Sequence, residues 1–214
     1  MKVYFISGLG ADETAFRGVF LPDTEKVHLN WLQPDPKETI EGYAARMAAR
    51  ITDPEPVIVG LSFGGIMAVE IAKQIPVKKL ILLSSAKTKH ELPPYFRLAR
   101  LIPLHRLLPL QTIARKRWIL KFFFGARSAE QQEGMLRIIN NMIPGFNEWA
   151  IDELIRWKNT VVPQNIYHIH GGADYLLPLR YVKPDYVIKK AGHLMVINNA
   201  KEVSTLLRRL IPLR

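Results

Sequence analysis

The fold of this 214-residue chain is decided by the stretch Pro56-Val57-Ile58-Val59-Gly60-Leu61-Ser62-Phe63-Gly64-Gly65. It begins as a short, β-branched apolar run, which is typical of a buried strand, and continues into 65–75, which has the apolar pattern of a helix. Gly60 and Gly64 each stand two residues from Ser62, where a sharp strand-to-helix turn leaves room only for glycine. We therefore expect the Ser62 hydroxyl to stand exposed above a sheet, as a candidate nucleophile.

The alternation of strand and helix extends to both sides of this stretch. Apolar runs that indicate buried parallel strands occur at 3–6, 26–31, 56–61, 80–83, 166–169 and 186–188. Helical patterns are clearest at 38–51, 65–75 and 201–210. This order predicts an α/β fold, with a doubly wound, mostly parallel sheet of about six strands in the order 2-1-3-4-5-6.

The alternation breaks after Ser84-Ser85, and about 80 residues pass before the next strand-like run. Prolines divide this segment into helix-like pieces at 97–102, 113–124, 130–143 and 148–158. We interpret residues 87–160, approximately, as a helical lid inserted into a single domain that spans 1–214.

The composition excludes several kinds of site and several classes of protein. The chain has no cysteine, which excludes disulfides, thiolate zinc sites and cysteine nucleophiles. Hydrophobic residues make up 48% and charged residues 23%, which is ordinary for a globular protein. The first apolar run is too short for a signal peptide, and no later run reaches the length of a membrane span. We expect a cytoplasmic protein.

The net charge of +11 is concentrated in one segment. Residues 87–127 hold ten lysines and arginines against a single acidic residue, Glu91. Such a segment favours an anionic lipid surface or an anionic substrate as partner, and a merely solvated basic face is the alternative. Nucleic acid is not expected, because neither a binding motif nor an aromatic platform accompanies the charge.

With the serine turn as anchor, the sequence resembles the α/β-hydrolase family, in its serine esterase and lipase-like branch with a helical lid. That family places a nucleophile, an acid and a histidine after successive strands. The resemblance implies Ser62, Asp174 and His193 as these residues, with Asp174 reached through 171–173 and His193 through 189–192. A serine hydroxyl needs an imidazole to accept its proton, and the imidazole needs a carboxylate to orient it.

The resemblance also implies an oxyanion hole, formed by the backbone N–H groups of Leu9 and Phe63. Leu9 lies in the loop 7–12, the counterpart of the family's oxyanion loop, in which Ser7 stands where histidine is common. The core is expected to lack the family's first strands.

The predicted function is a serine hydrolase that cleaves a carboxylic ester or a related acyl substrate through an acyl-enzyme on Ser62. Thioesters, amides and activated carbon–carbon bonds remain open. A serine at this position argues against the dehalogenase and epoxide-hydrolase branches, which use an aspartate there. Trp118, Phe122 and Trp149 are candidates for binding the acyl group, and the alternative is that they pack the lid onto the sheet.

Other functions receive less support. A receptor that keeps the hydrolase fold without efficient turnover is the alternative to an enzyme. His168 and His170 alternate along one strand without further ligands in metal-binding spacing, so we interpret them as strand residues and expect no metal. The glycine-rich turn lacks the dinucleotide fingerprint, so we expect no cofactor.

Overall fold

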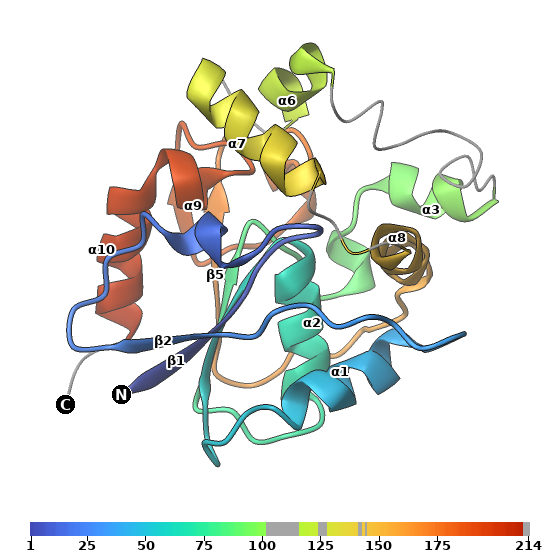
Figure 1. The fold of residues 1–214 in the computed structure, drawn as a ribbon, viewed down its shortest axis with the longest axis vertical. Helices are drawn as coiled ribbons and strands as arrows, with labels where there is room; N and C mark the ends of the chain where they lie inside the picture. The colour runs from blue at the N-terminus through green and yellow to red at the C-terminus, as the bar shows by residue number, and fades with distance from the viewer. Residues whose placement is uncertain (102–115, 124–127, 141–142, 144, 212–214) are drawn as a thin grey trace.

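The structure is a computed structural model that describes residues 1–101, 116–123, 128–140, 143 and 145–211 (Figure 1). Its centre is a parallel, six-stranded sheet in the order β2-β1-β3-β4-β5-β6. The strands are β1 (Lys2–Ile6), β2 (Glu25–His28), β3 (Val57–Leu61), β4 (Lys79–Leu83), β5 (Ile166–Gly171) and β6 (Tyr186–Ile188). The predicted α/β class and strand order are confirmed. β2 is shorter than the predicted run 26–31, because the chain leaves the sheet after Leu29, whose N–H still bonds to Phe5.

Helices cover both faces of the sheet (Figure 1). One face carries α1 (Ile40–Ala48), α2 (Phe63–Ala72) and α8 (Phe146–Arg156), and the other carries η1 (Glu13–Phe16), α9 (Met195–Asn198) and α10 (Ala200–Leu210). Alternate side chains of the central strands supply the two buried clusters: Tyr4, Ile58 and Leu80 point to the first face, and Phe5, Val59 and Ile81 to the second. The described helices include none long and apolar enough to cross a membrane.

Helices make up much of the described part of the segment between β4 and β5. It contains η2 (Lys89–Glu91), α3 (Pro94–Leu101), α6 (Arg117–Phe123), α7 (Ala129–Asn140) and α8, and η3 (Leu179–Tyr181) follows later in the chain. The predicted helical piece 113–124 lies partly outside the described residues. Gln131 of α7 donates a 2.6 Å hydrogen bond to Asn198 of α9, which connects this segment to a helix on the second face of the sheet.

The end of this segment is part of the core. Phe146, Ala150 and Trp157 are buried in the same cluster as α1 and α2. The indole N–H of Trp157 donates a 2.7 Å hydrogen bond to Glu70, a fully buried carboxylate that also pairs with Lys73. A buried carboxylate requires such partners, so α8 is fixed to α2 by polar as well as apolar contacts. A lid function for the rest of 87–160 stays a prediction.

Candidate active site

The turn that carries Ser62 joins β3 directly to α2. Ser62 has φ 53° and ψ −121°, a conformation that L-residues rarely adopt and that costs free energy. A side chain at Gly60 would overlap the backbone of Gly64 and Gly65, and one at Gly64 would overlap the carbonyl oxygens of Ile6 and Ser7. The close approach of these backbones explains both glycines, and it leaves Ser62 half-buried with its hydroxyl reachable.

Hydrogen bonds hold the strained turn. The Ser62 N–H donates to the carbonyl of Leu83 at 2.9 Å, and the Ser62 carbonyl accepts from the N–H of Gly65 at 2.9 Å and from the Ser85 hydroxyl at 2.7 Å. Ser85 is a residue that the sequence analysis did not assign to the site. The available signal was the pair of serines, Ser84 and Ser85, that follows β4, the strand paired with β3.

The three residues implied by the resemblance lie together at the carboxyl ends of β3, β5 and β6. The Ser62 Oγ is 2.9 Å from Nε2 of His193, and Nδ1 of His193 is 2.8 Å from Oδ2 of Asp174. Asp174 is 3% exposed and His193 2% exposed, so the hydrogen bond between them is shielded from water. The other oxygen of Asp174 accepts the N–H groups of Leu176 and Leu177 at 2.9 and 2.8 Å.

These contacts keep Asp174 ionised. Burial alone would raise the pKa of the Asp174 carboxyl, but the charge and hydrogen bond of His193, the N–H of Leu177 and the neighbouring His170 outweigh it, so this pKa lies below its ordinary value. An ionised carboxylate only accepts hydrogen bonds, so His193 must carry its proton on Nδ1. Its Nε2 is then free to accept the proton of Ser62.

The two backbone N–H groups expected to form the oxyanion hole belong to the loop 7–12 and to Phe63, which follows Ser62. A side chain built on Gly8 would contact the Ser62 Cβ at 3.5 Å, which places the loop 7–12 against the nucleophile. Phe63 begins α2, where a helix leaves its first N–H groups unpaired. In the described part of the chain, no hydrogen bond occupies the N–H of Leu9 or Phe63.

Ser7 and Trp31 hold the loop 7–12 in place. The Ser7 hydroxyl donates to the carbonyl of Ala11, so it ties the loop across its own turn. The carbonyl of Gly8 accepts from the N–H of Ala11 at 3.0 Å and from the Trp31 indole at 3.1 Å. Because the peptide is planar and trans, fixing the Gly8 carbonyl also fixes the direction of the Leu9 N–H, which belongs to the same peptide group.

The structure does not place the expected substrate-binding residues in a pocket. The Trp149 ring packs 4.4 Å from Tyr43 and 6.3 Å from Phe63, and its N–H donates to Glu38, so it is a packing residue that attaches α8 to the core. Trp118 lies on α6 with 65% of its surface exposed, so it lines no enclosed site. Phe122 belongs to α6, but its side chain lies outside the described structure. Helical spacing marked these aromatic residues as candidates, but it does not indicate whether each ring points towards the core, a substrate or solvent.

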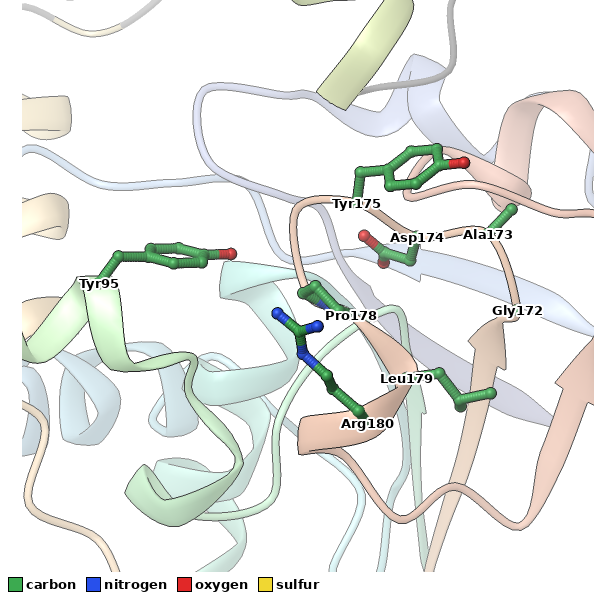
Figure 2. A pocket seen from close by; sticks show the side chains of 8 residues that line it. All are labelled: Tyr95, Gly172, Ala173, Asp174, Tyr175, Pro178, Leu179 and Arg180. Atoms are coloured by element: carbon green, nitrogen blue, oxygen red, sulfur yellow. The ribbon is translucent and has the colours of Figure 1, made fainter.

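A pocket of about 470 Å³ lies beside the acid (Figure 2). It is formed by Tyr95 of α3 and by residues of the loop after β5, with Asp174, Tyr175 and Arg180 among them. Figure 2 shows the Arg180 guanidinium reaching towards the space between Tyr95 and Asp174. Ser62 is not among the lining residues, so the pocket adjoins the acid rather than the nucleophile. The sequence analysis did not identify this pocket.

The basic segment is only partly described. Arg106, Arg115 and Arg127 lie outside the described residues. Lys87 is partly buried and donates a hydrogen bond to the Lys183 carbonyl, so it has a structural role. The cations seen exposed to solvent are Lys116, Arg117 and Lys121. An anionic lipid surface or substrate at this segment stays a prediction.

Comparison with solved structures finds the same fold in several proteins. A lipase-esterase related protein from Clostridium acetobutylicum is 18% identical with a TM-score of 0.69, and the match covers 98% of this chain and 93% of that one. A thermophilic esterase from Thermogutta terrifontis is 17% identical with a TM-score of 0.70, with 99% and 89% covered. A meta-cleavage product hydrolase from Pseudomonas fluorescens is 16% identical with a TM-score of 0.69, with 99% and 90% covered.

At such identities the structural likeness shows the fold alone. No curated protein matches the sequence. The profile of the alpha/beta hydrolase family, however, matches residues 5–206, a span that contains Ser62, Asp174 and His193. The chain therefore belongs to the alpha/beta hydrolase family.

Proposed function

We propose that this protein is a serine hydrolase that cleaves a carboxylic ester or a related acyl substrate through an acyl-enzyme on Ser62. One observation carries the proposal: an unbroken line of hydrogen bonds from Ser62 through His193 to Asp174, at 2.9 and 2.8 Å, at a strained turn. A nucleophile, a base and a group that orients the base within hydrogen-bonding reach are the signature of covalent acyl transfer. The esterases among the similar structures support the ester as substrate class.

Acylation follows from the protonation states. Nε2 of His193 takes the hydroxyl proton of Ser62 while Oγ attacks the carbonyl carbon of the substrate, and the electron pair of the C=O bond moves to oxygen. Asp174 stabilises the resulting imidazolium through Nδ1–H. The tetrahedral intermediate then breaks its bond to the leaving oxygen, which takes the proton from His193. The alcohol departs and the acyl group remains on Ser62.

The oxyanion is stabilised by the N–H groups of Leu9 and Phe63. The N-terminal end of α2 adds the positive end of its helix dipole at the place where negative charge develops. In deacylation a water molecule takes the place of the alcohol: His193 removes its proton, and the collapse of the second intermediate returns that proton to Ser62. No residue of the triad distinguishes an ester from a thioester or an amide.

Turnover of 4-nitrophenyl esters with short and long acyl chains tests the proposal. Ser62→Ala should leave a folded protein, judged by circular dichroism, and lower kcat by about 10⁴-fold or more, since the triad acts as a unit. A fluorophosphonate probe should label Ser62 alone. Ser128→Ala, which removes an exposed hydroxyl, is the matched control and should turn over like the wild type.

Two results would contradict the proposal. One is normal turnover in a verified Ser62→Ala protein. The other is a wild-type protein that binds esters but neither hydrolyses them nor reacts with the probe, which would favour the receptor alternative.

A further inference from the structure

Two buried histidines lie next to the proposed triad without a part in its proton transfers. His168 and His170 are on β5, on the same face of the strand, and neither has any exposed surface. Their rings contact each other, with Nε2 of His168 3.1 Å from Nδ1 of His170. Burying two imidazoles is costly unless their nitrogens are bonded, so their partners indicate what the pair does.

The acceptor at one end fixes the direction of every hydrogen bond in the pair. Nε2 of His170 lies 2.8 Å from the carbonyl of Leu177, which only accepts, so His170 carries its proton on Nε2. Nδ1 of neutral His170 is then an acceptor, and His168 must donate to it from Nε2. Nδ1 of His168 is left as a lone pair that faces no donor in the described structure.

The environment keeps both rings neutral. Burial lowers the pKa of His168 well below its ordinary value, with help from the neighbouring His170 and Lys87. Burial also lowers the pKa of His170, against the opposing effects of Asp174 and the Leu177 carbonyl.

His170 is connected to Asp174 by two routes, one direct and one through Leu177. Its Nε2 also lies 3.5 Å from Oδ2 of Asp174, the oxygen that holds His193. In addition, Leu177 is held at both ends, with its carbonyl bonded to His170 and its N–H donated to Oδ1 of Asp174 at 2.8 Å. Moving His170 would therefore disturb both oxygens of the carboxylate.

We propose that His170 is a positioning residue of the site: its Nε2–H holds the Leu177 carbonyl, and Leu177 in turn keeps the Asp174 carboxylate in register with His193. The inference rests on the proposed function. This role explains the buried histidine pair better than a metal site does, because no group of three ligating side chains occurs within the described ranges.

Two polar substitutions of His170 separate the role from mere packing. His170→Asn keeps an acceptor for His168 but has no group at the place of Nε2, whereas His170→Gln restores an N–H near that place. For 4-nitrophenyl acetate we expect His170→Asn to lower kcat by about 10-fold or more, with KM changed less than about twofold, because the loss acts in the transition state. His170→Gln should recover most of kcat.

A measurement on the resting enzyme supplies the second readout. The downfield proton resonance of Nδ1–H in His193 reports its hydrogen bond to Asp174, and it should move or broaden in His170→Asn and return in His170→Gln. His90→Gln, at an exposed histidine that the site does not use, is the control, and its kcat and resonance should stay at the wild-type values. Probe labelling of Ser62 gives the active fraction of each variant.

The results distinguish a failure of this inference from a failure of the proposed function. Wild-type kcat and an unmoved resonance in His170→Asn would overturn the inference, as would equal losses in the Asn and Gln variants with an unmoved resonance. If the wild type shows no turnover that depends on Ser62, the proposed function fails. In that case the resonance still tests whether His170 holds Asp174 against His193.

Discussion

Substituting His168 by Gln should make the protein more resistant to acid. In the folded state the ring is fully buried, and burial, His170 and Lys87 together hold its pKa well below the ordinary 6.5. In the unfolded chain the same ring takes up a proton near pH 6.5. The unfolded state therefore binds more protons than the folded state below that pH, and the contribution of His168 to stability is lost as the pH falls.

The magnitude follows from the linkage relation. An unfolded pKa of 6.5 limits the loss in the free energy of unfolding to about 2 kcal/mol between pH 7.5 and pH 5, the value reached when the folded state binds no proton over this range. This is a large part of the roughly 5–15 kcal/mol that stabilises a typical domain. Gln at 168 has no such proton to take up, so this part of the acid sensitivity should disappear.

Urea unfolding at pH 7.5, 6.5, 5.5 and 5.0, followed by circular dichroism, measures the effect as the difference between variant and wild type at each pH. That difference cancels the other groups that titrate over this range. His90→Gln, at an exposed histidine, is the control and should run parallel to the wild type. If His168→Gln also runs parallel to the wild type, His168 is protonated in the folded state and the assignment of a neutral pair is wrong.

Two further changes test the turn and the pocket. Gly64→Ala should destabilise the protein by about 1–3 kcal/mol or more and slow probe labelling of Ser62, because the new methyl group overlaps the carbonyls of Ile6 and Ser7; urea unfolding and labelling rates measure both effects. Arg180→Gln should lower kcat/KM for the anionic ester mono(4-nitrophenyl) succinate about 2- to 5-fold at low salt, and leave 4-nitrophenyl acetate unchanged. Arg208→Gln, at an exposed arginine of α10, serves as its control, and equal responses to both esters would leave Arg180 without a role in recognition.

The parts of the fold that follow from local rules could be predicted from the sequence. Strand positions and their order follow from apolar runs and right-handed crossovers, which constrain a parallel sheet strongly. The turn at Ser62 was predictable for a similar reason, because the space at Gly60 and Gly64 admits no side chain. The positions of Asp174 and His193 came from the resemblance, and the structure brings both side chains to Ser62.

Contacts between distant segments could not be predicted in this way. Trp149 shows helical spacing, but only the packed structure shows that its ring contacts Tyr43. His170 shows the alternation of a strand, and its bond to the Leu177 carbonyl depends on how the loop after β5 folds back. Patterns in the sequence indicate burial, whereas partners across the fold depend on tertiary geometry.

An aromatic cluster lies under the proposed oxyanion hole. Trp31 fixes the peptide that carries the Leu9 N–H, and its ring lies 5.6 Å from the ring of Phe63, the residue with the other proposed N–H donor. Phe146 of α8 packs 4.9 Å from Trp31 and 6.4 Å from Phe63. One aromatic cluster thus contacts the segments that carry both proposed oxyanion donors, and α8, from the segment between β4 and β5, is part of it. Through this packing, α8 contributes to the rigidity of the proposed catalytic site.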